Sequence, residues 1–277
     1  MTKRFGFTLA EVLITLGIIG VVAAMTIPNL IANTNGAKFR SQFKKTISTL
    51  SQAGLMAQAQ YDFDYAGTAE VCGAGEGESA SDPKTKHPED VMTFCSLLNG
   101  TLTGHTYLGT VGDIKRSVNG NSIDYMPQNG TSFRGSTIAQ ADATKYIAYS
   151  LADGAIVAFN PDAKNCELAL GNQVNATVLQ ATESTVNDDG STTSGLANCL
   201  GFIDVNGTTL PNKEVVCSAS GEGDGAVENL SSSFDVDKPC TVKNDATHMT
   251  DIFPIVFHDA IVEPASNAAK YVLTSAK

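Results

Sequence analysis

The stretch that decides the fold is FTLAEVLITLGIIGVVAAMTIPNLI, residues 7–31, in which Glu11 is the only charged residue. A short leader, residues 1–6, precedes it and carries Lys3 and Arg4. Twenty-five residues at about 1.5 Å each are long enough to cross a bilayer core of roughly 30 Å. We therefore predict a membrane-spanning helix whose basic leader stays cytoplasmic, with the rest of the chain on the far side.

Glu11 is the informative residue, because a carboxylate deep in a membrane helix costs about 2.5–3.5 kcal/mol and is normally kept for a function. The surrounding pattern resembles the prepilin processing and methylation signature of type IV pilins and type II secretion pseudopilins. That resemblance extends to about Ile31, and it rests on Gly6, Phe7, Thr8, Leu9 and Glu11 followed by the apolar run.

The resemblance implies cleavage between Gly6 and Phe7 by a prepilin peptidase, followed by N-methylation of Phe7. It also implies assembly with other pilin subunits by a platform protein and a cytoplasmic ATPase. The new amine at Phe7 is cationic at neutral pH, so Glu11 of a neighbouring subunit can neutralise it inside the bilayer. The mature chain then has 16 basic residues against 29 acidic ones, a net charge near −13.

Two simpler interpretations of this segment compete with that one. A secretory signal peptide would be cleaved before Met25, with Val22 and Ala24 as the small residues, and an ordinary anchor would stay uncleaved. Glu11 argues against both, because it weakens a signal peptide and is an unexplained cost in an anchor. A lipoprotein is excluded because the first cysteine is Cys72.

Three residues predict flexibility in the apolar segment. Pro28 cannot donate its amide, and Gly17 and Gly20 loosen the preceding turns, so we expect a bend. The resemblance implies a loss of helicity between Gly20 and Pro28 on assembly, and a plain kink at Pro28 fits the sequence equally well.

A second helical half follows, because apolar residues recur there at intervals of three and four. This stripe should pack on a sheet and consists of Phe39, Phe43, Ile47, Leu50, Gly54 and Ala57. Residues 33–36, Asn-Thr-Asn-Gly, could break the helix locally. The resemblance favours a nearly continuous helix from Phe7 to about Gln60, about 80 Å long.

The six cysteines form an even set without close C-x-x-C pairs, which favours disulfides outside the cytoplasm over metal ligands. Six cysteines permit 15 connectivities. Sequence-near pairs are favoured because shorter loops cost less entropy to close. These pairs are Cys72–Cys95, Cys166–Cys199 and Cys217–Cys240.

The remaining pattern predicts short strands and one short helix at residues 89–98. The clearest signal is a hairpin, residues 146–151 and 155–159, and further strands are expected at 106–111, 200–205 and 252–258. The fold class is therefore α+β: a long N-terminal helix packed on an antiparallel β-meander with disulfide-tied loops. We divide the chain into leader 1–6, membrane helix 7–31, amphipathic continuation 32–60 and globular domain 61–277.

Two separated stretches resemble a motif of pilin-like proteins, GFIDVNGTTLPNK at residues 201–213 and DIFPIVFHDAIVEP at residues 251–264. The long insertion between them puts their close packing in doubt. Asp204, Asn206 and Asp251 offer oxygen ligands for calcium, although Asp-Val-Asn-Gly is also favourable turn chemistry without a metal. We expect no other cofactor.

Several function classes are disfavoured. The net charge of −11 argues against general nucleic-acid binding, and no nucleophile elbow, phosphate loop or compact carboxylate pair predicts an enzyme. The histidines show no metal-ligand spacing and are read as structural or solvated; they are His87, His105, His248 and His258.

Two functions remain. The first is a structural filament subunit, held in the inner membrane before assembly and located in a cell-surface or periplasmic filament afterwards. The second is a minor pilin at or near the tip that binds a surface or a secreted substrate. The sequence does not choose between a pilus and a secretion pseudopilus.

Overall fold

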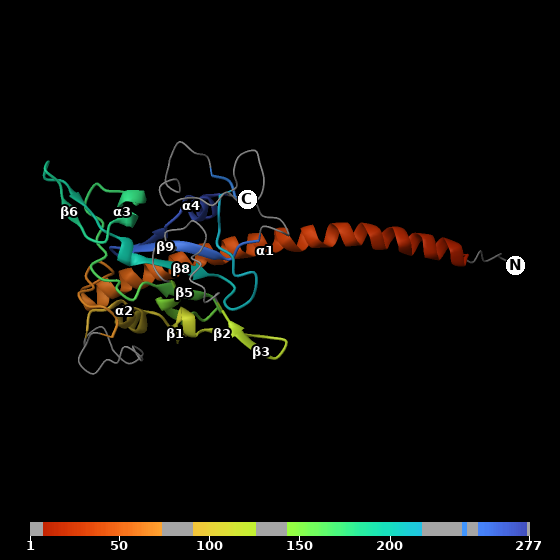
Figure 1. Ribbon diagram of the computed structural model, residues 1–277, viewed down its shortest axis with the longest axis horizontal. Coiled ribbons are helices and arrows are strands. Elements are labelled where there is room, and N and C mark those ends of the chain that lie inside the picture. Colours follow the sequence, from red (N-terminus) through yellow and green to blue (C-terminus); the bar gives the residue numbers. More distant parts are fainter. Residues whose placement is uncertain (1–7, 74–90, 126–142, 218–239, 243–248, 276–277) are drawn as a thin grey trace.

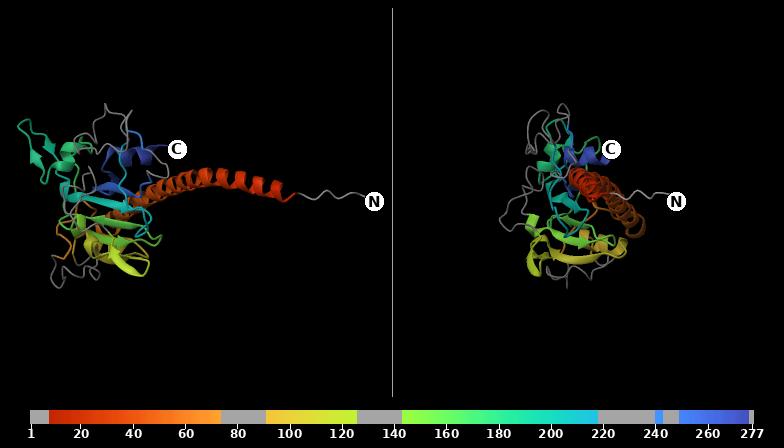
Figure 2. Two further views of the ribbon diagram at one scale, coloured as in Figure 1. Left: turned by 45° about the vertical axis from the view of Figure 1, so that its right-hand side comes forward. Right: turned by 90° about the vertical axis from the view of Figure 1, so that its right-hand side faces the viewer.

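The fold is organised around one helix that is much longer than any other described element. The computed structural model describes residues 8–73, 91–125, 143–217, 240–242 and 249–275. Helix α1 (Leu9–Tyr61) has 53 residues, and its N-terminal half extends away from the sheet domain (Figure 1). The helix is continuous, as predicted, and it runs through both Pro28 and residues 33–36. Figure 2 shows it as a gentle curve rather than a sharp kink.

Residues next to each end of α1 explain why the helix begins and ends where it does. Thr8 caps the N-terminus, with its side chain accepting a hydrogen bond from the Glu11 amide. Asp62 ends the helix in the left-handed region, at φ 61°. The apolar stripe of the C-terminal half is buried, with Phe43, Leu50 and Ala57 fully inaccessible.

The sheet has six antiparallel strands, and their order in space equals their order in the chain, which makes it a meander. In that order they are β1 (Thr106–Thr110), β4 (Ile147–Ser150), β5 (Ile156–Phe159), β8 (Leu200–Asp204), β9 (Ile252–His258) and β10 (Ile261–Pro264). The predicted hairpin and the three other predicted strands are therefore present. β10 was not predicted.

Smaller elements decorate the meander. They are α2 (Phe94–Thr101), the hairpin of β2 (Lys115–Val118) and β3 (Asn121–Asp124), α3 (Ala176–Gln180), the hairpin of β6 (Thr185–Val186) and β7 (Thr192–Thr193), and α4 (Asn267–Thr274). Short 3-10 turns lie at η2 (Val111–Asp113), η4 (Ala143–Lys145) and η5 (Ala197–Cys199).

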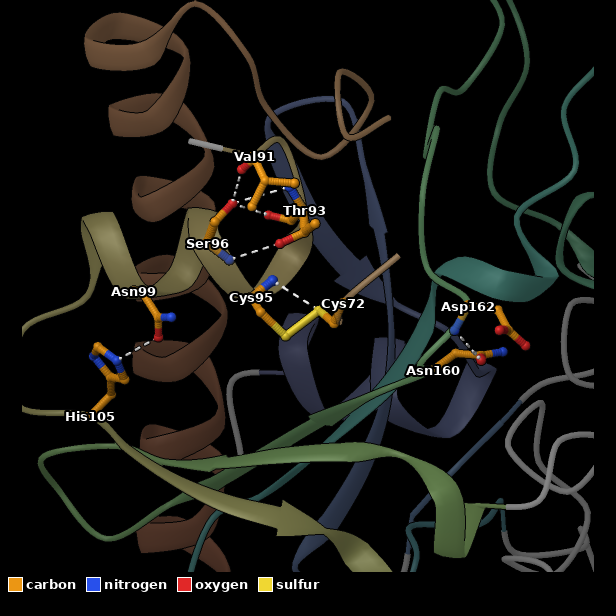
Figure 3. Close-up of a disulfide and its surroundings, with 9 residues drawn as sticks. All are labelled: Cys72, Val91, Thr93, Cys95, Ser96, Asn99, His105, Asn160 and Asp162. Atoms are coloured by element: carbon orange, nitrogen blue, oxygen red, sulfur yellow. Dashed lines mark hydrogen bonds between the residues drawn. A yellow bond between two sulfur atoms is a disulfide. The ribbon is translucent and has the colours of Figure 1, made fainter. Parts of the chain in front are cut away.

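The helix predicted at residues 89–98 begins later than expected. Thr93 and Ser96 form a reciprocal capping box that starts α2 at Phe94 (Figure 3). Glu89 and Asp90 lie outside the described residues.

Apolar side chains fill both faces of the sheet. Alternate residues of a strand point to opposite faces, so Val157 and Phe159 join the core beneath α1 while Ile156 and Ala158 join a second core. The second core is closed by the segments around β2 and β3, including Tyr125. Burial on both faces explains why β5, β8 and β9 are inaccessible along their whole length.

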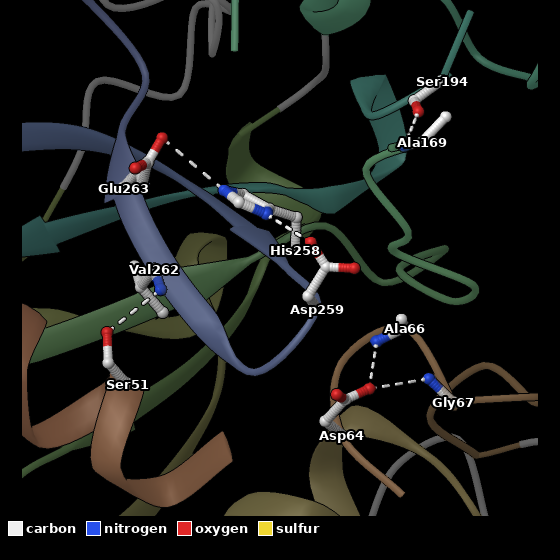
Figure 4. Close-up of polar contacts among 10 residues, drawn as sticks. All are labelled: Ser51, Asp64, Ala66, Gly67, Ala169, Ser194, His258, Asp259, Val262 and Glu263. Carbon is white, nitrogen blue, oxygen red and sulfur yellow. Dashed lines mark hydrogen bonds and ion pairs between the residues drawn. The ribbon is translucent and has the colours of Figure 1, made fainter. Parts of the chain in front are cut away.

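The C-terminal half of α1 is fixed to β9 and β10 by specific contacts. The ring of Phe43 stacks on that of Phe253, with centroids 4.3 Å apart. The hydroxyl of Ser51 accepts a hydrogen bond of 3.0 Å from the Val262 amide (Figure 4). Gly54 allows the closest approach, because a Cβ there would lie 2.6 Å from the Ala260 carbonyl oxygen.

Three disulfides join the loops, and they are the sequence-near pairs favoured above. Cys72–Cys95 links the segment after α1 to α2 (Figure 3), Cys166–Cys199 closes the excursion between β5 and β8, and Cys217–Cys240 closes the insertion before β9. Each disulfide joins two cysteines of the same connecting segment, and none joins two strands of the six-stranded sheet.

Gly54→Ala should destabilise the folded domain, because the added methyl group would contact backbone that cannot move without shifting β9 and β10. Overpacking of this kind costs about 1–3 kcal/mol. The measurement is the thermal unfolding midpoint of the full chain in detergent, followed by tyrosine near-UV circular dichroism.

Gly17→Ala is the matched control, since nothing lies within 4 Å of a Cβ at Gly17. Its midpoint should equal that of the unchanged protein or exceed it slightly, because alanine favours helix. Equal midpoints for the two variants would contradict the tight contact at Gly54.

Candidate functional site

The N-terminal end of α1 forms a small polar site of its own. The Oε2 atom of Glu11 accepts hydrogen bonds from the Thr8 amide at 2.7 Å and from the Thr8 hydroxyl at 2.8 Å. The Thr8 hydroxyl in turn accepts from the Glu11 amide at 3.3 Å. This is a capping box, and it gives Glu11 a partner within its own chain. Gly6 and Phe7, the predicted cleavage and methylation residues, lie outside the described residues.

The first half of α1 is apolar on every side, and none of the described residues covers it. Its large apolar side chains range in exposure from 44% at Val12 to 79% at Leu9. Leu9–Pro28 is long and apolar enough to cross a membrane, and none of it is buried. We call the globular part of the chain from the end of α1 onwards, residues 61–277, the head. A helix that is hydrophobic all round requires a lipid or protein environment, which the described residues of the head do not supply.

Gly17 and Gly20 lie on this exposed half and make no close contact, because a Cβ at either position would have nothing within 4 Å. The isolated chain therefore gives no packing reason for glycine at these two positions. Their role in helix flexibility, with that of Pro28, stays a prediction.

A second polar site is buried where β8 ends and β9 begins. Asp204 and Asp251 are both completely inaccessible. The carboxylate of Asp204 accepts hydrogen bonds from the Asn206 amide, at 3.2 Å, and from the Tyr125 hydroxyl. The carboxylate of Asp251 accepts from the amides of Asn212 and Lys213, at 2.9 and 2.7 Å.

This cluster corrects the expectation that the insertion separates the two halves of the motif. β8 and β9 are neighbours, with Asp204 opposite Ile252. The Pro-Asn step, Pro211 and Asn212, is linked to Asp251 by the hydrogen bond from the Asn212 amide. The side chain of Asn212 also donates a hydrogen bond to the Tyr125 carbonyl at 3.2 Å. The two halves therefore pack closely.

Burial raises the pKa of both acids, and the charge of Asp251 adds to the increase for Asp204. Loss of solvation, with the charge of Asp251 second, raises the pKa of Asp204 to about 8. Loss of solvation also raises the pKa of Asp251 to about 6, against four hydrogen bonds that lower it. At neutral pH, Asp204 is therefore largely protonated.

Asp204, Asn206 and Asp251, the predicted calcium ligands, are thus brought together. The donor set is oxygen, which suits calcium, and the side-chain oxygens of Asn206 and Asn212 are buried without a hydrogen-bond partner among the described residues. Against this, amide and hydroxyl donors already contact both carboxylates, and the described residues contain no group of three His, Cys, Asp or Glu arranged for a metal. Calcium binding stays a prediction.

The two histidines in the described part of the chain make structural contacts. His105 bonds the Leu102 carbonyl and the Asn99 side chain (Figure 3). His258 lies between two acids, 2.9 Å from Asp259 and 3.6 Å from Glu263 (Figure 4). The interactions with Glu263 and Asp259 raise its pKa despite its burial, and of the two contacts only that with Asp259 is short enough to be a hydrogen bond. His87 and His248 lie outside the described residues.

Sequence reasoning missed parts of both polar sites. The spacing Thr8-x-x-Glu11 before an apolar run is a readable capping-box signal. No local signal points to Tyr125, because it reaches Asp204 only through the sheet topology, 79 residues away along the chain.

Comparison with known proteins supports the interpretation of the N-terminus. The family described as the prokaryotic N-terminal methylation motif matches residues 1–27. The chain therefore carries the type IV pilin and pseudopilin signature on the segment that includes Thr8 and Glu11. No curated protein and no solved structure matches the chain.

The free energy of unfolding should fall as the pH rises from 5 to 8. A raised pKa means that the folded state binds the proton more tightly than the unfolded state does, so the stabilisation is lost between the unfolded value near 4 and the folded value. One such group changes the free energy by up to ~1.4 kcal/mol per pH unit. Denaturant unfolding of the full chain at four pH values measures the slope.

Asp204→Asn is the control, because it keeps the shape and removes the titration. In this variant the free energy of unfolding should fall with pH along a distinctly flatter slope. The slope that remains comes from Asp251 and, above about pH 6.5, from His258, whose raised pKa also lowers the free energy of unfolding as the pH rises. Identical slopes for the variant and the unchanged protein would contradict the assignment to Asp204.

The calcium prediction has its own readout in the same experiment. Bound calcium should raise the unfolding midpoint with concentration, and Asp251→Asn should abolish that increase. A midpoint that does not move between chelator and millimolar calcium would exclude the site.

Proposed function

We propose that the chain is a processed, membrane-anchored subunit of a type IV pilus or type II secretion pseudopilus. The observation that carries this proposal is the division of α1: one half is apolar all round and uncovered, and the other half is packed on a sheet. The methylation motif on residues 1–27 supports it. Pilins that carry this signature are structural proteins, and we propose no catalytic activity.

In the proposed precursor, the leader is cytoplasmic and the disulfide-bonded head lies on the other side of the membrane. Three disulfides within the described residues support an oxidising compartment for the head. Cleavage between Gly6 and Phe7 then creates an amine that pairs with Glu11 of a neighbouring subunit. Lipid surrounds the apolar half of α1 before assembly, and other subunits surround it afterwards.

A second candidate, the tip-located binding subunit, is favoured by one feature. The excursion closed by Cys166–Cys199 lies at the end of the molecule opposite the N-terminus (Figure 1), and it exposes Leu170 completely and Val186 by 75%. Immunogold labelling distinguishes the two candidates, since a major subunit is labelled along the filament and a tip subunit only at its end.

Glu11→Gln should abolish filament formation while leaving the helix cap intact. Glutamine can fill the capping position towards Thr8, but it cannot neutralise the Phe7 amine, whose burial without a counter-charge costs several kcal/mol. The variant is expressed with the wild-type assembly machinery. Sheared filament is then measured relative to the amount of processed subunit in the membrane.

Thr8→Val is the matched variant, because it removes the cap and keeps the charge. It should assemble at a level close to that of the unchanged protein. Intact mass should show a mature start at Phe7 in every case, whereas a start at Met25 would indicate a signal peptide and an intact Met1 a plain anchor. Normal filament from processed Glu11→Gln protein would contradict the pairing.

A further inference from the structure

The charges of the chain are segregated along its long axis. From Val12 to Tyr61 there is no Asp or Glu, and the four basic residues in this span are Lys38, Arg40, Lys44 and Lys45. Residues 61–277 hold 12 Lys and Arg against 28 Asp and Glu, a net charge of −16 with histidine neutral. The helix that emerges from the apolar segment is therefore a basic stem beneath an acidic head.

Most of the basic stem is open to contact. Lys38 and Lys44 are exposed, and among the described residues the one hydrogen bond of the Lys44 ammonium is to the Ser275 carbonyl, at 3.4 Å. Lys45 pairs with Asp153 at 2.9 Å, but its side chain is still 65% exposed. Arg40 is half-buried, and its Nε atom has no hydrogen-bond partner in the part of the chain that the structure describes. The head neutralises at most one of the four cations by an ion pair among the described residues.

The opposite end of the same helix is acidic. Asp62 and Glu70 are exposed, and Asp64 is half-buried, with one oxygen bonded to the amides of Ala66 and Gly67 (Figure 4). Lys38 and Asp62 are 24 residues apart, which is about 36 Å along a helix at 1.5 Å per residue. The basic and acidic segments thus lie at the two ends of the packed half of α1.

Two complementary surfaces at opposite ends of one molecule cannot satisfy each other within that molecule. They meet only between copies. In copies held parallel by the membrane orientation that we propose, the contact is heterologous and repeats along an axis, whereas an antiparallel pair that would close into a dimer is excluded by that orientation. It also offsets the mutual repulsion of heads that each carry a large negative charge.

The placement of the cations gives a second reason. Lys38 to Lys45 all lie within 17 residues of Pro28, on the side of the span that we propose is outside the cytoplasm. Cations so close to a span favour the cytoplasmic side, so they oppose the orientation signal of Lys3 and Arg4. A contact needed for assembly explains why basic residues occupy this position.

We propose that the basic stem of one copy, Lys38 to Lys45, docks on the acidic distal segment of a second copy, Asp62 to Glu70. This inference rests on the proposed filament function and names a contact in addition to the Glu11 pairing. The two copies are staggered along the helix axis by about the separation of the two segments.

Charge reversal with rescue tests the contact in the full chain, expressed with its assembly machinery. Lys38→Glu with Lys44→Glu should lower sheared filament at least tenfold per processed subunit, and Asp62→Lys with Glu70→Lys should do the same. All four changes together should restore filament to within about threefold of the unchanged protein. Lys164→Glu with Lys270→Glu, which changes the net charge equally, should assemble normally.

Carbodiimide cross-linking of assembled filament identifies the partner directly, because it joins an amine to a carboxylate only in contact. The expected product is an amide between Lys38 or Lys44 and Asp62, Asp64 or Glu70 of another copy. Mixed light and heavy isotope-labelled subunits distinguish links between copies from links within one copy.

The outcomes separate this inference from the proposed function. Normal filament from the Lys38→Glu, Lys44→Glu variant, with Glu11→Gln inactive, would overturn the docking contact alone. Loss of filament without rescue by the fourfold reversal would also overturn it, as expected if the stem binds anionic lipid instead. Absence of the unchanged, processed protein from sheared filament made by its own assembly machinery would overturn the proposed function itself.

Discussion

The structure depends on one helix whose two halves meet different environments, an apolar one along its first half and the sheet and water along its second half. The first half of α1 has no sheet to pack on, so it is apolar on every side, whereas the second half needs only one apolar stripe because its other sides face water. The head can approach the helix only where that stripe begins, near Phe39. Gly54 then sets how closely β9 and β10 approach the helix, since a side chain at this position would meet the Ala260 backbone.

The long loops between the strands do not change the strand order of the meander that packs on α1. Each long excursion leaves and returns between neighbouring strands, and each disulfide closes a loop between neighbouring segments of the chain. The β8–β9 ladder, from Leu200 opposite Val256 to Asp204 opposite Ile252, pairs the two strands across the longest insertion, and Asp251 binds the amides of Asn212 and Lys213 beside it. The insertion can therefore be long without loosening the sheet, because closing a longer loop costs little additional entropy.

Local patterns predicted most of the fold, and long-range contacts account for what was missed. Apolar spacing located α1 and its buried stripe, and alternation with β-branched residues located β4, β5, β8 and β9. β10 and α4 were missed because residues 259–277 have no strong periodicity, and β10 forms by pairing with β9. Asp204 and Asp251 were singled out from the sequence, but their burial was not predictable, since it depends on Tyr125 and on the second core.

The hydrogen bonds from Thr8 to Glu11 are compatible with the pairing that we propose for Glu11 in the filament. Both hydrogen bonds from Thr8 end on Oε2, and a carboxylate has about four lone-pair sites on its two oxygens, so Oε1 can accept from a second group. The cap holds the carboxylate in one orientation. In the assembly that we propose, an incoming amine would meet a carboxylate that has already lost part of its side-chain freedom, which lowers the entropic cost of pairing slightly. The charge that would neutralise the amine belongs to Glu11 alone, so the proposed assembly depends on Glu11 far more than on Thr8.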